Sequence, residues 1–106
     1  MSYLYEKKLE GQTSANGTIT LEADQACWHN QLIISRGTAT AGTLTIKYKL
    51  GGKTFAMKDQ YGVAVTMALT ADPEPIRFDG MVDAVIIEQS GNNGTFNALL
   101  IGQATS

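Results

Sequence analysis

The side chains best suited to catalysis are found at Cys27 and His29, which flank Trp28 in the sequence. On a β-strand, residues i and i+2 project from the same face, so Cys27 and His29 could touch. A cysteine beside a histidine is the minimal activated thiol nucleophile. A lone cysteine is more often a small buried hydrophobic residue, and the local signatures of cysteine proteases are missing. We therefore expect that the chain is not an enzyme, and a Cys27–His29 enzyme is the less favoured alternative.

Other site chemistries have weaker support in the sequence. Asp79 and Asp83 could bind a hard cation through their oxygens, but two aspartates around Gly80 are better explained as a turn between strands. The glycine-containing segment 37–42 lacks the Gly-Lys-Ser/Thr ending and the following helix of a phosphate-binding loop. One cysteine and one histidine exclude most zinc sites. The sequence predicts no catalytic residue, no metal site and no cofactor.

The composition is that of a small, weakly acidic domain. The 106 residues are 43% hydrophobic and 17% charged, which suits a single core, so we predict one domain over residues 1–106. The net charge of −2 disfavours nucleic acid as the main partner, because phosphate-binding proteins normally carry a basic excess. No apolar run approaches the length of a membrane-spanning helix, and the first residues do not resemble a secretory signal. We therefore expect no membrane partner.

Strict alternation of apolar and polar residues is the strongest structural signal. In residues 43–50 every even position is apolar and every odd one is Thr or Lys, and residues 18–22, 63–70 and 76–79 repeat the pattern. Because successive side chains on a strand point to opposite faces, each segment predicts a strand with one buried face. The predicted core includes Ile19, Leu21, Ile34, Leu44, Ile46, Tyr48, Phe55, Val65, Met67, Leu69, Phe78, Val85, Ile87, Phe96 and Leu100.

Turn residues separate the predicted strands at short intervals. Gly51 and Gly52 between two strands predict a two-residue hairpin, and the prolines in residues 72–75 predict a rigid connector. Residues 22–28 are the only helical candidate. Residues 1–11 are expected to form an N-terminal arm or an edge strand. Together the pattern predicts an all-β fold: a single antiparallel β-sandwich, jelly-roll-like, of about eight strands.

Three segments are apolar on both faces of the predicted strand, namely residues 32–34, 82–87 and 95–101. A single sandwich of this size covers only one face of each sheet, so the second face needs cover from loops or from other subunits. We expect a homo-oligomer in which these strands and the N-terminal segment form contacts. The predicted interface residues are Tyr3, Tyr5, Ile33, Ile86, Leu99 and Ile101.

Aromatic side chains outside the predicted core could stack on sugar rings. Trp28 and Tyr61 are the candidates, since a small β-sandwich with aromatic residues in its loops is the usual architecture of a carbohydrate-binding module. Four lysines between residues 47 and 58 could form a basic patch, although lysines on the wet face of a strand mainly keep a sheet soluble. A carbohydrate-binding module that uses Trp28 and Tyr61 is the alternative to a structural role.

A succession of turns and alternating strands rich in Thr and Gly runs through residues 16–21, 32–37, 41–48, 76–80 and 82–85. In this succession the chain resembles small β-sandwich virion proteins of tailed bacteriophages, which decorate or cement capsids or form accessory parts of tails. The resemblance implies a non-enzymatic homo-oligomer that docks on capsid or tail proteins and uses no cofactor. It also implies a location in the virion after assembly in the cytoplasm of a bacterial host, which agrees with a lone free cysteine.

Overall fold

Strands account for all the regular structure in residues 3–12, 16–23 and 29–103, which are the residues that the computed structural model describes. This part of the chain contains nine strands and no helix, so the all-β prediction is confirmed. The strands are β1 (Tyr3–Gln12), β2 (Gly17–Glu22), β3 (His29–Arg36), β4 (Thr43–Leu50), β5 (Lys53–Ala56), β6 (Thr66–Ala68), β7 (Ile76–Asp79), β8 (Ala84–Ser90) and β9 (Phe96–Gln103). Of the helical candidate 22–28, Glu22 ends β2, and residues 24–28 lie outside the described part.

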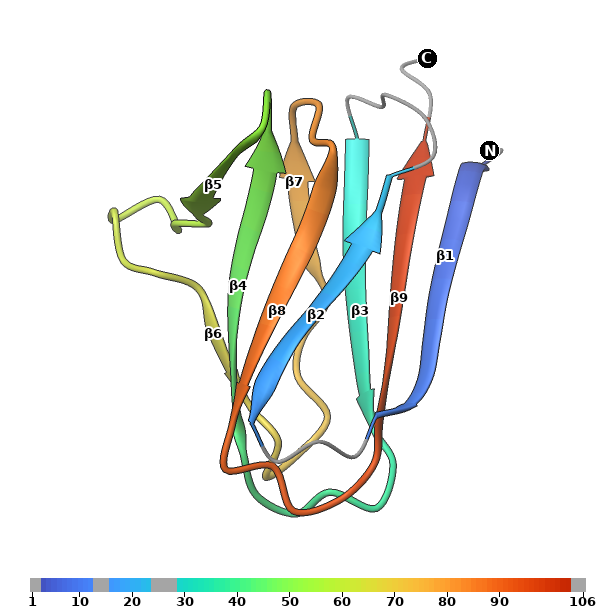
Figure 1. Cartoon of the computed structure of the whole chain (residues 1–106), viewed down its shortest axis with the longest axis vertical. Helices are drawn as coiled ribbons and strands as arrows, with labels where there is room; N and C mark the ends of the chain where they lie inside the picture. Colours follow the sequence, from blue (N-terminus) through green and yellow to red (C-terminus); the bar gives the residue numbers. More distant parts are fainter. Residues whose placement is uncertain (1–2, 13–15, 24–28, 104–106) are drawn as a thin grey trace.

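The strands form two antiparallel sheets that pack face to face (Figure 1). Sheet I has the order β1-β9-β3-β7, and sheet II has the order β2-β8-β4-β5, with β6 also paired to β4. The chain changes sheet at almost every step, so strands that are neighbours in sequence lie in opposite sheets. This interleaving of strands between two antiparallel sheets is the topology of a jelly roll, and the predicted jelly-roll-like sandwich is confirmed.

The ninth strand arises because one strand position at the edge of sheet II is broken in two. β5 pairs with residues 47–50 of β4, and β6 pairs with residues 43–45 of the same strand. Between them, the Ile46 N–H donates to the Val65 carbonyl at 3.0 Å, and the Ile46 carbonyl accepts from the Met57 N–H at 3.2 Å. Of the residues 63–70 that were predicted to form a strand, only residues 66–68 do so. The residues before them belong to a hairpin that turns away from β4.

The core lies between the sheets and follows the alternation of the strands. Its largest fully buried side chains are Leu21, Leu32, Ile34, Leu44, Ile46, Leu69, Val85, Ile87, Phe96 and Leu100. Asn30, Gln89 and Asn92 are also buried, and every buried side-chain polar atom of the described residues has a hydrogen-bond partner. Four predicted core residues are less buried than expected: Tyr48, Val65 and Phe78 are half-buried, and Phe55 is exposed.

One end of the sandwich is closed by hydrogen bonds between the loops that follow β3 and β8 (bottom of Figure 1). The Asn93 Oδ1 accepts the N–H groups of Thr40 at 2.9 Å and Ala41 at 3.0 Å, and the Asn93 Nδ2 donates to the Thr40 Oγ1 at 2.8 Å. Thr38 and Thr95 exchange backbone-to-hydroxyl bonds in both directions, at 3.1 and 2.9 Å. The loops at this end are therefore fixed to each other.

Candidate functional site

An apolar pair lies on the outer face of sheet I, where β3 and β9 run side by side. Ile33 and Leu99 are directly opposite each other in the antiparallel register. Their neighbours Leu32, Ile34 and Leu100 point inward and are buried, so alternation directs Ile33 and Leu99 outward. Both side chains are half-buried in the isolated chain. Two of the six predicted interface residues thus form one partly exposed apolar surface on sheet I.

This apolar pair forms part of a shallow groove of about 160 Å³. Its other lining residues are Lys8, Ser35, Asn97 and Ala98, and Lys8 lies opposite Leu99 across the β1–β9 ladder. The groove therefore has an apolar centre with a polar border. That combination is typical of a docking surface for another protein, in which a desolvated centre is surrounded by a polar rim.

The other two predicted interface isoleucines differ from this pair. Ile101 is more deeply buried, and Ile86 lies on the other sheet. Ile101 lies on β9, two residues beyond Leu99, but its side chain is only 6% exposed and is not part of the core cluster. Ile86 is half-buried on the outer face of sheet II, between Thr20 of β2 and Lys47 of β4. The structure therefore places Ile33 and Leu99 on one outer face of the sandwich and Ile86 on the opposite one.

The N-terminal pair of the predicted interface lies on an edge strand. Tyr3 pairs with Gln103 and Tyr5 with Gly102, so the backbone of both residues belongs to β1 at the edge of sheet I. The orientation of their side chains lies outside what the structure describes. The edge of β1 that faces away from β9 has no partner strand within the chain's described sheets.

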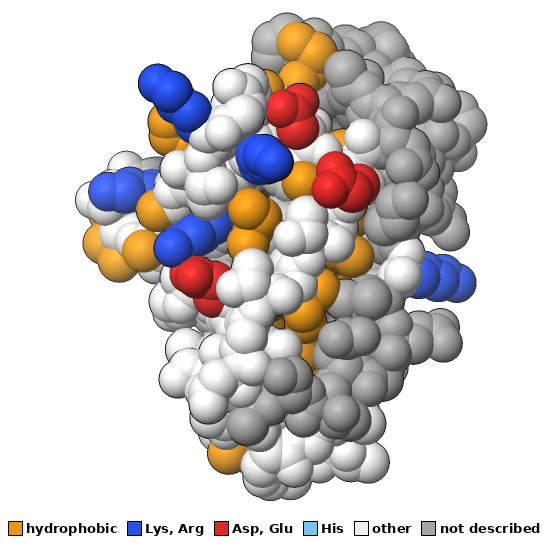
Figure 2. All heavy atoms as spheres, in the orientation of Figure 1, with side chains coloured by type: hydrophobic (Ala, Val, Ile, Leu, Met, Phe, Trp, Pro, Cys, Tyr) orange, Lys and Arg blue, Asp and Glu red, His pale blue; other side chains and the backbone are white. Residues whose placement is uncertain are grey.

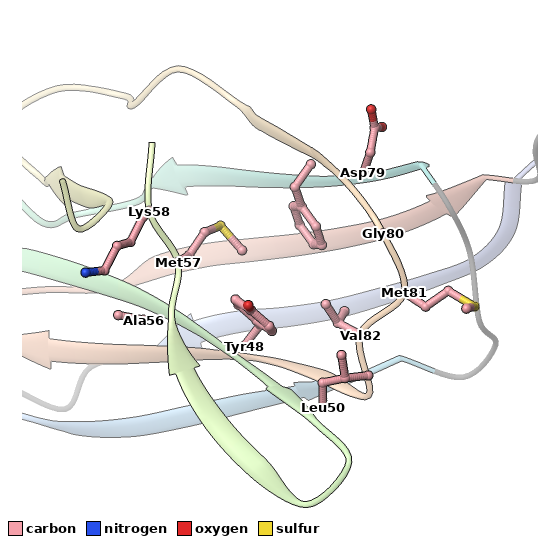
Figure 3. A pocket seen from close by; sticks show the side chains of 10 residues that line it. Tyr48, Leu50, Ala56, Met57, Lys58, Asp79, Gly80, Met81 and Val82 are labelled. Carbon is pink, nitrogen blue, oxygen red and sulfur yellow. The ribbon is translucent and has the colours of Figure 1, made fainter. Parts of the chain in front are cut away.

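A second candidate site is a cleft of about 670 Å³ at the end of the sandwich away from the fixed loops. It is lined by residues from the end of β4, the start of the segment after β5, and the loop from β7 to β8. Figure 3 shows Tyr48, Met57 and Val82 converging from these three elements, with Leu50 beside them. Tyr48 also stacks on Phe55, with ring centroids 5.4 Å apart. The cleft has a mainly apolar wall.

Of the five exposed large hydrophobic side chains of the described residues, two line this cleft, one stacks on a residue that lines it, and two belong to the segment that follows. Leu50 and Phe55 come from the β4–β5 hairpin, Met81 from the β7–β8 loop, and Tyr61 and Val63 from the segment between β5 and β6. Among these residues the sequence predicts a surface role only for Tyr61. Leu50 and Met81 each lie within one residue of a glycine turn, and an apolar residue at such a position is the signal that could have found them.

Tyr61 is presented by a small hairpin, which we call the edge hairpin (residues 57–65). The Val65 N–H donates to the Met57 carbonyl at 2.9 Å and closes its base, and Lys58 and Ala64 form a β-bridge above. At its tip the Asp59 carboxylate accepts the N–H groups of Tyr61 at 2.8 Å and Val63 at 3.0 Å. Tyr61 is 81% exposed as a result. The other predicted sugar-binding residue, Trp28, lies outside the described residues.

The residues considered for catalysis and metal binding have structural partners where they are described. The His29 Nδ1 donates to the Asp79 Oδ1 at 2.9 Å, because His29 and Asp79 face each other across β3 and β7. The Asp83 carboxylate accepts the Gly51 N–H at 2.9 Å and so supports the β4–β5 turn. Cys27 lies outside the described residues, within which no group of three His, Cys, Asp or Glu side chains could hold a metal ion.

One of the four lysines that could form a basic patch is in an ion pair. Lys47 contacts Glu88 across β4 and β8, with 2.7 Å between Nζ and Oε1. Lys49, Lys53 and Lys58 are exposed and are not paired with a carboxylate in the part of the chain that is described. In Figure 2 most of the basic side chains in this view lie over β4 and β5, with acidic side chains close to them.

Comparison with known proteins identifies the fold but no family. No protein-family model matches the chain, and no curated protein matches its sequence. Among solved structures, the crystal structure of the SPBc2 prophage-derived protein YomS is similar to this chain, with a TM-score of 0.61 and 13% sequence identity. The match covers 92% of this chain and 94% of YomS. The described residues include no helix of the length and hydrophobicity needed to cross a membrane.

Proposed function

We propose that this chain is a non-enzymatic structural protein of a bacteriophage virion, a capsid decoration protein or a tail accessory component. It acts through contacts with other subunits and with capsid or tail proteins, and it is assembled in the cytoplasm of the bacterial host. The observation that carries this proposal is the jelly-roll fold, which is shared over nearly the full length of both chains with a prophage-derived protein. The Ile33–Leu99 pair on the outer face of sheet I supports it independently.

The proposed mechanism is burial of apolar surface, repeated in many copies. Ile33 and Leu99 are half-buried in the isolated chain, so completing their burial would contribute about 1 kcal/mol each, half the usual value for a large apolar side chain. Such a contact is weak for one subunit. On a symmetric particle, each subunit that makes several contacts at once gains avidity, so weak contacts suffice for stable attachment.

The test is incorporation into particles. Phage particles from cells that carry this gene are separated on a density gradient, and the chain is detected in the particle fraction with an antibody. The double variant Ile33→Thr/Leu99→Thr places β-branched threonine, which favours strands, at both positions and reduces the apolar area of the groove. We expect the wild-type chain in the particle fraction and the double variant largely in the unbound fraction.

A control for this experiment is Thr70→Ala, which changes an exposed turn residue outside the strands. Circular dichroism checks that all variants are folded. A wild-type chain that is absent from purified particles would overturn the proposal. Ile86→Thr, on the outer face of sheet II, decides whether this second predicted apolar face also takes part.

A carbohydrate-binding module is the second candidate, because the exposed Tyr61 at the tip of the edge hairpin could stack on a sugar ring. A glycan array measures this directly, with Trp28→Ala and Tyr61→Ala as variants. Binding by the wild-type chain that is lost in either variant would favour this function. A virion protein could also bind host glycans, so the particle experiment is needed in either case.

A further inference from the structure

We infer that the cleft between the β4–β5 hairpin and the β7–β8 loop is the surface through which two copies of this chain form a symmetric dimer. This inference goes beyond the proposed function, because it assigns a different face and does not require a virion. It follows from two properties of the cleft, its apolar surroundings and the charges on its two sides.

The first property is the concentration of exposed apolar side chains. Leu50 and Met81 line the cleft, Phe55 stacks on the lining residue Tyr48, and Tyr61 and Val63 project from the adjacent edge hairpin. Elsewhere in the described part of the chain, no other large hydrophobic side chain is exposed. Soluble monomers scatter such residues over the surface, whereas a patch around a cavity indicates an interaction site.

The second property is a pair of opposite charges on different sides of the cleft. Lys58, at the base of the edge hairpin, lines the side that belongs to sheet II, and Asp79, at the end of β7, lines the side that belongs to sheet I. Figure 3 shows both side chains pointing away from the apolar wall, in different directions. The Asp79 side chain is 79% exposed even though it accepts a hydrogen bond from His29.

These charges make the surface complementary to itself. A two-fold axis that passes between the two sides of the cleft places Lys58 of each copy near Asp79 of the other copy. The same operation brings the apolar walls together, and it lays the edge hairpin of each copy, with Tyr61 and Val63, along the other copy. Dimers with two-fold symmetry use the same patch on both subunits, so a patch with separated opposite charges fits a second copy.

The test is a charge exchange measured by analytical ultracentrifugation of the full chain. Lys58→Asp and Asp79→Lys each place like charges opposite one another in the dimer. We expect each single variant to raise the dimer dissociation constant at least about tenfold. The double variant Lys58→Asp/Asp79→Lys restores opposite charges, and we expect it to recover most of the wild-type affinity.

Two controls separate this interface from other effects. His29→Ala removes the intramolecular partner of Asp79 without a charge reversal, and Lys53→Asp reverses an exposed charge that does not line the cleft. Both are expected to dimerise like the wild-type chain. A strictly monomeric wild-type chain at high concentration would overturn the inference, and so would single variants that dimerise normally or a double variant that does not recover.

Failure of this inference and failure of the proposed function can be distinguished. Particle incorporation is measured with the Ile33 and Leu99 variants on sheet I, and dimerisation is measured in the absence of particles with the Lys58 and Asp79 variants. If the cleft instead receives an apolar segment of another protein, the wild-type chain stays monomeric alone. That outcome rejects the second copy as occupant.

Discussion

Gly42, the residue before β4, has no room for a side chain. Its φ is +134°, and a Cβ there would lie 2.9 Å from the Asn92 Cα. Gly80 has a φ of +109° but open space around the same position, so it is a matched control for backbone strain alone. We expect Gly80→Ala to lower the free energy of unfolding by about 1–3 kcal/mol and Gly42→Ala to lower it by more. Urea unfolding followed by circular dichroism measures both, and equal losses would contradict the argument.

Asn93 fixes the closed end of the sandwich through its side chain. Because it accepts two N–H groups and donates to a hydroxyl, we expect Asn93→Ala to cost about 1–2 kcal/mol of stability, although the residue is exposed. Asn93→Asp keeps the acceptor for both N–H groups and loses only the donor, so it should cost less. Thermal unfolding of the two variants checks this order, which would be refuted if Asn93→Asp were the less stable.

At the scale of residues, the alternation predicted which way a side chain points but not how completely it is covered. Tyr48 and Phe78 were predicted in the core and do point between the sheets, yet they are half-buried because they line the cleft. The burial of a strand residue depends on what the opposite sheet places against it. A single strand's sequence contains no information about that, so the cleft could not be predicted.

At the scale of elements, the edge hairpin is separable from the sandwich. Lys58 and Ala64 form a β-bridge, so replacing residues 59–63 by Asn-Gly gives a two-residue hairpin turn between paired residues. Because the removed residues include the exposed Tyr61 and Val63, we expect the unfolding free energy to change by less than about 1 kcal/mol. Urea unfolding at low protein concentration, where dimers do not contribute, tests this expectation.

The β4–β5 turn is the contrasting case for this prediction. Gly51 and Gly52 have φ values of 62° and 80°, so valine at both positions would strain the turn, whereas we expect the edge hairpin to tolerate replacement. If the shortened edge hairpin were as destabilising as Gly51→Val/Gly52→Val, the hairpin would have to be part of the folded framework. The Gly51-Gly52 turn could be predicted from the sequence, because two glycines between two strands accept the positive φ values that a two-residue hairpin turn needs.

The break between β5 and β6 was not predictable in the same way. Residues 63–70 alternate as well as any strand, but only residues 66–68 are assigned to one. What interrupts the pairing is the Asp59 carboxylate, which holds the turn at the tip, together with the Met57–Val65 hydrogen bond at the base. Both form within residues 57–65 as turn contacts, which the alternation of apolar and polar residues does not show.

At the scale of the whole molecule, the strand order predicts which parts open first. β8 and β9 are each hydrogen-bonded to strands on both sides, whereas β7 and the edge hairpin lie at edges. In hydrogen exchange followed by mass spectrometry, we expect amides of β8 and β9 to exchange last and those of β7 and residues 57–65 to exchange first. Protection of β7 equal to that of β9 would show that the sheets open only together.

The sequence also could not predict which of the outward-facing apolar residues lie on the same sheet. Two-sided apolar strands were recognised correctly, since Ile33, Leu99 and Ile86 all lie on outer faces. The sequence does not give strand order, however, so it could not tell that β3 and β9 are neighbours in one sheet and that β8 belongs to the other. Topology thus decides which of these residues can act together.

The position of β9 has a consequence for biosynthesis. This strand lies between β1 and β3, although it is the last of the nine to leave the ribosome. Until it emerges, the nascent polypeptide holds β1 and β3 without the strand that joins them, and their backbone donors and acceptors stay open to other chains. Folding of this sheet must therefore wait until translation has passed Gln103, and ribosome-bound fragments that stop earlier should remain sensitive to proteases.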